Sequence, residues 1–384
     1  MTIIIFFILL SVLVLFHELG HYLAARLFGV KALEFGFGFP PRAIGLVKDR
    51  GRWKWVGPRD QTEYKKTVWS LNWLPFGGFV RLKGEVEDGD EDRDSLVQKP
   101  FWQKLVVMSA GVGLNWVLAV GLFFTVFTFG TTAVLEDLPS SAKISNRAIM
   151  VVQVLPGSPA DKAGVQSGDE IVSLAGSVPA SEQAARDAIG AQGEKSFEMV
   201  VKRNKQDVKL ELKPIVIKEI NKPGIGVGLA NVGFVTFPVH VAAYQSVYMT
   251  AVLTKAVVVA FGNIFKDLIV THKVNQDLAG PIGIAVMTGQ VARQGLMPLL
   301  QFAAMLSINL AVINFLPIPA LDGGRALFLL IEKIRRRPMG RKLEVGIHNV
   351  AFLLLILLIV LVTARDLFRY GGMILGSVKG LVGM

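Results

Sequence analysis

Long stretches without a charged side chain constrain the fold of this chain more than any other feature of its sequence. Residues 105–130 and 296–321 each run for 26 residues without an Asp, Glu, Lys or Arg. A helix rises about 1.5 Å per residue, so either stretch can cross the ~30 Å hydrocarbon core of a bilayer, even when tilted. We therefore predict membrane-spanning helices at both places.

Two further spans are expected near the ends of the chain. Residues 3–16 carry no charge, but they lack the positively charged start and the small-residue cleavage site of a secretory signal peptide. We interpret them as part of a first span near 3–25 that is retained rather than cleaved. Residues 347–364 also lack Asp, Glu, Lys and Arg, which predicts the last span. The sequence thus predicts about four transmembrane helices.

Composition supports a membrane protein. The 384 residues are 52% hydrophobic and 18% charged, with a mean hydropathy of +0.49, which is too apolar for a soluble protein of this length. The net charge is +11, but the basic residues are not interleaved with aromatic ones along one face. This argues against nucleic acid as a partner and favours the anionic headgroups of a lipid bilayer. The chain has no cysteine, so any metal must be held by His, Asp or Glu.

The first predicted span contains a His-Glu-x-x-His pattern, formed by His17, Glu18 and His21. Residues four apart lie on one face of a helix, so both imidazoles can bind one Zn²⁺ while Glu18 lies beside the open position of the metal. The pattern also occurs by chance on ordinary amphipathic helices. Ionisable residues are costly inside a membrane, however, and the apolar context therefore favours a hydrolytic zinc site.

A carboxylate at the end of the third predicted span supplies a candidate third ligand. Pro317 and Pro319 break the helix and free backbone groups, which at membrane depth is tolerated only inside protein or beside a water-filled cavity. Asp322 follows directly. An anionic side chain there needs a partner, and a zinc ion bound by His17 and His21 is a sufficient one.

The chain changes character between residues 144 and 229, where short strand patterns and one helix pattern at 181–189 predict a folded soluble domain. Residues 156–165, followed by 168–171, resemble a PDZ domain in the permuted form found in bacterial proteases. Residues 224–229 would be its late edge strand. PDZ domains bind extended peptides at an exposed edge, so two roles remain open: binding a peptide or substrate segment, and only occluding access.

Two other regions are expected to lie at the membrane surface. Residues 26–104 contain turn glycines and partial alternation, which predict membrane-associated β-hairpins, and their acidic run at 85–94 is expected to be a solvated loop. Residues 231–265 are apolar but ambiguous. Because Asp322 must reach the depth of the two histidines, an even number of crossings must separate them. We therefore place 240–270 as interfacial amphipathic helices.

The two metal-site motifs together resemble the site-2 protease family of intramembrane zinc metalloproteases. The second motif, Asn-x-x-Pro-x-x-x-Leu-Asp-Gly-Gly, occupies residues 314–324, and the segments 75–82 and 280–284 fit the family as well. The likeness covers nearly the whole chain and is greatest to bacterial regulators that cleave anti-sigma factors. The chain departs from that pattern in having one PDZ-like domain instead of two. Val112 also stands where the family usually has proline.

The resemblance implies a mechanism. Zn²⁺, held by three side chains, polarises the peptide carbonyl, while Glu18 takes a proton from the attacking water and returns one to the leaving amine. Asn314 would lie beside the substrate carbonyl and stabilise the oxyanion; the alternative is a hydrogen bond between helices. The substrates would be single-span membrane proteins, such as an anti-sigma factor or a signal-peptide remnant, unwound and paired as a strand with the hairpin at 77–82.

The expected organisation is an α-helical polytopic membrane protein with an inserted α/β PDZ-like domain and a β-hairpin region. In chain order it consists of an N-terminal membrane region (1–143), the PDZ-like domain (144–229), interfacial helices (230–295) and a C-terminal membrane region (296–384).

The basic loop at 333–342 marks the cytoplasmic side, which places the PDZ-like domain outside the cytoplasm of a bacterial inner membrane. Two alternatives to a protease remain. One is a membrane-anchored PDZ adaptor with a structural zinc site. The other is a zinc transporter, which is disfavoured because one closed site offers no relay of ligands.

Overall fold

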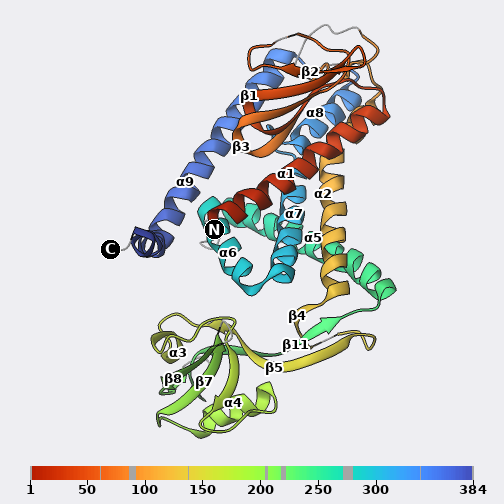
Figure 1. The fold of residues 1–384 in the computed structure, drawn as a ribbon. Coiled ribbons are helices and arrows are strands. Elements are labelled where there is room, and N and C mark those ends of the chain that lie inside the picture. The colour runs from red at the N-terminus through yellow and green to blue at the C-terminus, as the bar shows by residue number, and fades with distance from the viewer. Residues whose placement is uncertain are drawn as a thin grey trace. The chain divides into compact units, whose positions relative to one another are not determined.

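The computed structural model describes residues 2–60, 62–85, 92–136, 138–203, 206–217, 222–270, 280–337 and 339–382. These residues form two compact units (Figure 1). The first, called here the membrane unit, comprises residues 1–124 and 246–384. The second, called the inserted unit, comprises residues 125–245.

Helices dominate the membrane unit. In chain order they are α1 (Thr2–Leu27), α2 (Phe101–Phe129), α5 (Val239–Val270), α6 (Pro281–Gln294), α7 (Leu296–Phe315), α8 (Asp322–Arg335) and α9 (Arg341–Val382), with α2 and α5 continuing into the inserted unit. Among the described residues, α1, α2, α5, α7 and α9 are long and apolar enough to cross a membrane. The predicted fold class, a polytopic helical membrane protein, is confirmed.

Helix α5 differs from the expectation for residues 240–270. Instead of several amphipathic helices, the structure has one continuous helix of 32 residues. Its polar side chains do not interrupt it, because the hydroxyls of Thr250 and Thr254 donate to backbone carbonyls one turn earlier, at 2.7 and 2.6 Å. By length and composition α5 is a fifth candidate span, and its interfacial placement stays a prediction.

An antiparallel sheet follows α1, as the turn glycines between residues 26 and 104 predict. Its strands are β1 (Ala32–Asp49), β2 (Arg52–Val56) and β3 (Val68–Leu82), in the order β2-β1-β3. Residues 34–37 of β1 pair with both halves of β3, because β3 doubles back at Gly77, whose φ of 77° favours glycine. The returning half of β3 pairs with residues 34–37 of β1, and together with the turn at Gly77, called here the β3 hairpin, it packs beside α1 (Figure 1).

The core of the membrane unit fixes α1 against this sheet and against α2. Tyr22 and Ala25 of α1 are buried together with Phe35 of β1, Leu82 of β3 and Val107 of α2. Burying apolar surface of this kind is the main force that holds such elements together outside the lipid. The contact holds the histidine-bearing turn of α1 between the sheet and α2.

The inserted unit is built on a six-stranded sheet with the order β4-β11-β5-β6-β7-β8. Its elements are β4 (Thr131–Val134), β5 (Lys143–Val154), α3 (Pro159–Lys162), β6 (Glu170–Leu174), α4 (Glu182–Ala191), β7 (Phe197–Arg203), β8 (Gln206–Leu212) and β11 (Val227–Thr236), with β9 (Ile215–Ile217) and β10 (Lys222–Gly224) as a separate pair. Its core is apolar and includes Val151, Met199 and Ile225. An inserted α/β domain was predicted, and it is present.

The edge strand predicted at residues 224–229 is only partly present. Gly224 ends β10, residues 225–226 form a turn, and β11 starts at Val227. In the described pairings, residues 227–230 of β11 pair with β5 alone, whereas β4 pairs with residues 232–235 on the other side. The pairing with β4 was not predicted, because β4 precedes residue 144, where the domain was expected to begin.

The acidic run at 85–94 was expected to be a solvated loop. Residues 86–91 lie outside the described residues. Glu85 instead forms an ion pair with Arg325 of α8, and Asp94 lies 3.1 Å from Lys83. At its two ends, therefore, the run is paired rather than only solvated.

Candidate metal centre and active site

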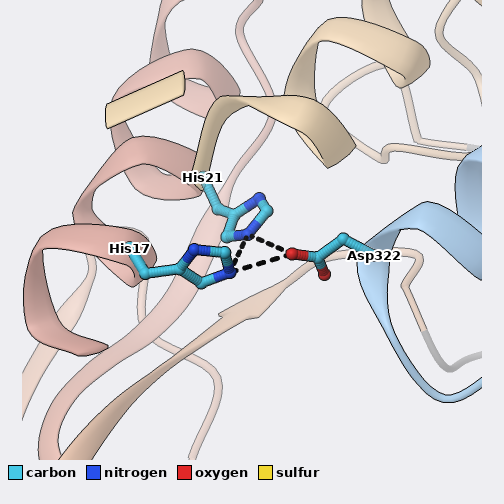
Figure 2. Close-up of side chains that lie close together, drawn as sticks. All are labelled: His17, His21 and Asp322. Atoms are coloured by element: carbon cyan, nitrogen blue, oxygen red, sulfur yellow. Dashed lines mark hydrogen bonds and ion pairs between the residues drawn. The ribbon is translucent and has the colours of Figure 1, made fainter. Parts of the chain in front are cut away.

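Three donor atoms from α1 and α8 converge in the membrane unit. His17 and His21, which are 5% and 8% exposed, lie one turn apart on α1, and Asp322 is the first residue of α8. The Nε2 atom of His17 lies 2.8 Å from Oδ2 of Asp322, and that of His21 lies 3.3 Å from it (Figure 2). The two Nε2 atoms are 3.3 Å apart. The predicted ligands therefore face one common point.

This donor set fits zinc. Two nitrogens at about 2.0–2.1 Å from one tetrahedral Zn²⁺ would be about 3.3–3.4 Å apart, and the two Nε2 atoms are separated by 3.3 Å. Among the described residues, His17, His21 and Asp322 are the one group whose spacing suits a metal ion. Two imidazoles and a carboxylate are also the ligand number and type of a catalytic zinc site with one open position.

A bend in the chain carries Asp322 to the histidines. Helix α7 ends at Phe315, and the proline-containing segment 316–321 turns before α8 begins. Gly323 and Gly324 make this turn possible, because a Cβ at Gly323 would lie 2.2 Å from a backbone oxygen of the turn and one at Gly324 would lie 2.3 Å from another. From α9, His348 accepts a hydrogen bond from the Ala320 N–H at 2.8 Å, a contact that the sequence did not suggest.

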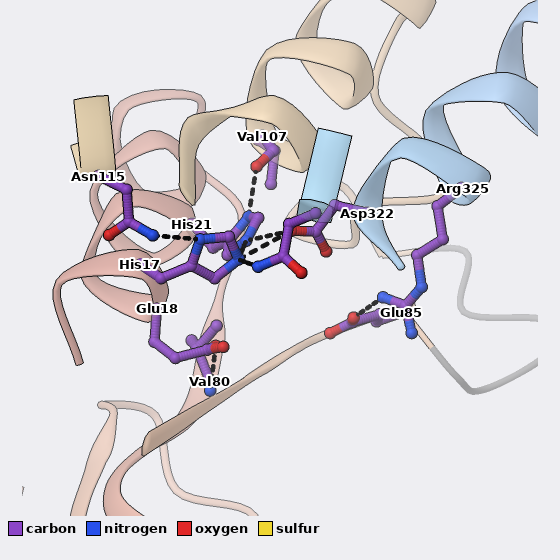
Figure 3. Close-up of polar contacts among 10 residues, drawn as sticks. His17, Glu18, His21, Val80, Glu85, Val107, Asn115, Asp322 and Arg325 are labelled. Atoms are coloured by element: carbon purple, nitrogen blue, oxygen red, sulfur yellow. Dashed lines mark hydrogen bonds and ion pairs between the residues drawn. The ribbon is translucent and has the colours of Figure 1, made fainter. Parts of the chain in front are cut away.

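Helix α2 also lines the site, because it contacts both histidines. The Nδ1–H of His21 donates to the carbonyl of Val107 at 2.8 Å, and Asn115 lies 3.3 Å from Nδ1 of His17 (Figure 3). A Cβ at Gly111 would come within 2.4 Å of Nε2 of His21, so only glycine fits between the helix and the two rings. The structure thus brings Gly111 and Asn115 to the site, whereas a Cβ at Gly113 would meet nothing within 4 Å.

The two remaining predicted site residues also lie here. Glu18 turns toward the hairpin, where its Oε2 accepts the N–H of Val80 at 3.0 Å (Figure 3). Asn314 of α7 places its Nδ2 atom 3.3 Å from Nε2 of His17. All five residues singled out from the sequence are thus brought together, although they come from three helices.

An ion pair beside the site was missed by sequence reasoning. Arg325, three residues after Asp322, pairs with Glu85, which lies three residues beyond the end of β3 (Figure 3). Burial lowers the pKa of Arg325, but the neighbouring Glu85 outweighs it and raises that pKa above its ordinary value. The guanidinium therefore stays charged. A lone Arg after an Asp-Gly-Gly motif carries no signal of its partner, which is 240 residues away.

Comparisons with known proteins agree with this site. The sequence model of peptidase family M50 matches residues 5–57 and 59–358. A Clostridium perfringens protein named as a zinc metalloprotease is 33% identical over 93% of this chain and 96% of its own length. The regulator of sigma-W protease RasP of Bacillus subtilis is 29% identical over 96% of this chain and 98% of its own.

Solved structures resemble one part of the chain. The PDZ domain of an SdrC-like protein from Listeria monocytogenes is 24% identical, with a TM-score of 0.21, and the similarity covers 23% of this chain and 92% of that one. The family match, by contrast, spans most of the sequence and includes every residue of the candidate site. The chain therefore belongs to peptidase family M50, as an intramembrane zinc metalloprotease of the site-2 protease type.

Proposed function

We propose that this protease hydrolyses a peptide bond within or next to the transmembrane helix of single-span membrane proteins, such as an anti-sigma factor or a signal-peptide remnant. The observation that carries the proposal is that His17 and His21, on a helix apolar enough to span a membrane, converge with Asp322 of α8 on one point. The name of the Bacillus subtilis relative, a regulator of sigma-W protease, supports the first substrate class.

Each residue of the site has a role in this reaction. His17, His21 and Asp322 would hold zinc, which when bound supplies Lewis-acid polarisation of the carbonyl and acidifies water. Glu18 takes the proton of the attacking water and returns one to the leaving amine. The Val80 N–H holds the Glu18 carboxylate in place, because it donates to Oε2 at 3.0 Å. The Asn314 amide donates to the developing oxyanion.

The hairpin of β3 offers a place for an unwound substrate. Peptide bonds in a helix are shielded by their own hydrogen bonds, so the segment must become extended before attack. The returning half of β3 lies beside the catalytic base, since the Val80 N–H donates to Glu18, and this position supports pairing of the extended substrate with that segment. The Gly77 N–H is anchored to the buried hydroxyl of Ser11 at 3.2 Å, which keeps the tip of the hairpin against α1.

The inserted domain, proposed as residues 144–229, would lie outside the cytoplasm of a bacterial inner membrane, because the basic loop at 333–342 marks the other side. It would take up a peptide or substrate segment. In support, β4 pairs with residues 232–235 of β11, whereas the described pairings leave the outer side of residues 227–230 open. An open strand side is what a bound peptide requires.

The test separates catalysis from metal binding. Glu18→Gln should retain zinc and lower cleavage of a single-span reporter by about 10²–10⁴-fold, the range for loss of a general base. His17→Ala, His21→Ala and Asp322→Asn should each lose zinc, measured by elemental analysis of the purified protein. Wild-type turnover by Glu18→Gln would remove the base assignment. Full zinc content in His21→Ala would remove the ligand assignment.

A further inference from the structure

Asn115 of α2 has a buried side-chain oxygen, Oδ1, without a hydrogen-bond partner in the described part of the chain. The residue is fully buried, and its amide Nδ2 lies 3.3 Å from Nδ1 of His17. Buried side-chain acceptors without a partner are rare in folded proteins, so an orphan beside a metal-ligand candidate calls for a physical reason.

The chemistry of His17 supplies that reason. Its Nε2 atom faces Asp322 and His21, as a metal-binding atom must. A neutral imidazole that binds a metal through Nε2 carries its proton on Nδ1, which makes Nδ1–H a donor. The amide NH₂ of Asn115 is a donor too. With zinc in place, this orientation of the amide would set two donors against each other and leave the one acceptor unused.

A half-turn of the amide replaces the contact between two donors with a hydrogen bond and gives the amide oxygen a partner. The oxygen and nitrogen of an Asn amide occupy equivalent positions, and the hydrogen-bond network decides which of them faces a neighbour. With Oδ1 toward His17, the amide accepts the Nδ1–H and the orphaned atom is satisfied. We propose that Asn115 is a positioning residue for the metal centre, whose amide oxygen accepts the Nδ1–H of His17 and so fixes the tautomer and orientation of that ring.

The surroundings of Asn115 suit this role. His21 already has an equivalent partner, the carbonyl of Val107, two turns earlier on the same helix. The backbone at Asn115 is itself anchored, because the buried Ser307 hydroxyl of α7 donates to the Asn115 carbonyl at 2.8 Å. Helix α2 would thus hold both imidazoles by their outer nitrogens. The inference rests on the proposed ligand set and adds to it a residue that contacts a ligand rather than the metal.

The test measures zinc affinity, by competition of the purified full-length protein with a chromogenic chelator, and does not depend on turnover. Asn115→Leu removes the acceptor and should weaken zinc binding by about 10- to 100-fold. Asn115→Asp keeps an acceptor of similar shape and should bind zinc at least as tightly as the wild type. Gly113→Ala is the matched control on the same helix, since a Cβ there meets nothing within 4 Å, and should change nothing.

Two results would overturn the proposal: wild-type zinc affinity in Asn115→Leu, or a loss in Asn115→Asp as large as in Asn115→Leu. Thermal unfolding of each variant shows whether it folds. If the leucine variant does not fold, Asn115→Asp decides alone, because retained zinc supports the acceptor role and lost zinc refutes it. His21→Ala tests the ligand set separately from the positioning role of Asn115. Undiminished zinc binding in His21→Ala would refute the ligand set, independently of the results with the Asn115 variants.

Discussion

At the scale of single residues, the amide of Asn314 has two candidate roles: an oxyanion donor and a hydrogen bond between helices. It comes from the last turn of α7, before the proline-containing bend, and reaches the Nε2 side of His17, where the metal and the reacting carbonyl would meet. Asn115, in contrast, reaches the Nδ1 side of the same ring. Two amides on opposite sides of one imidazole can thus serve different purposes, one for chemistry and one for position.

Asn314→Ala should lower kcat by about 10²–10³-fold, as for the loss of one oxyanion donor, while zinc content and thermal stability stay unchanged. Steady-state cleavage of a single-span reporter, with elemental analysis, measures both. Ile313→Ala, at the neighbouring partly exposed position, is the control and should retain activity. If Asn314→Ala instead loses metal or fails to fold, the Asn314 amide serves to hydrogen-bond neighbouring helices together and is not an oxyanion donor.

At the scale of elements, the site depends on how α8 is held against the β3 hairpin. Asp322 begins α8, and the hairpin positions Glu18 through Val80. The Glu85 and Arg325 ion pair joins these two elements, and both side chains are partly buried. The metal ligand and the catalytic base would therefore be kept in register by a contact that touches neither of them.

Reversing one charge of this pair should separate the two elements. Glu85→Arg and Arg325→Glu should each lower cleavage by about 10- to 100-fold through misplacement of the base and the ligand, because each leaves like charges in a partly buried site. The double reversal should recover much of the loss. The matched control is Lys209→Glu, which breaks an exposed pair with Glu198 in the inserted unit and should be silent. A double variant no better than the single ones would exclude the proposed coupling.

At the scale of the whole molecule, the inserted domain supplies no candidate metal ligand among the described residues. We propose that its role concerns the substrate. If it filters substrates by size, replacing residues 144–229 with a short flexible linker should leave zinc binding and cleavage of a short-tailed substrate intact. The variant should also gain cleavage of a substrate with a bulky extracytoplasmic part. Parallel assays of both substrates measure this. A linker variant inactive on the short-tailed substrate, with zinc bound, would show that the domain presents substrate instead.

Much of this architecture could be predicted from local sequence. Spans were recognised because the absence of charge over a bilayer's length is a property of consecutive residues. The pairing of His17 with His21 follows from helix periodicity, and the bend before Asp322 follows from Pro317 and Pro319. Local reasoning was less successful where the partner strand was distant, as with β11, whose neighbour β4 lies about a hundred residues earlier.

The sequence by itself determined that the chain spans a membrane, that one turn of its first helix carries a zinc-binding pattern, and that a carboxylate follows a broken helix. Only the tertiary structure decided what supports these groups: the Val107 carbonyl behind His21, Asn115 behind His17, and Glu85 opposite Arg325. The physical reason is the same in each case. A backbone carbonyl, an amide or a single charge has no periodic signature, and its partner lies 86 to 240 residues away, so only the packed helices define the contact.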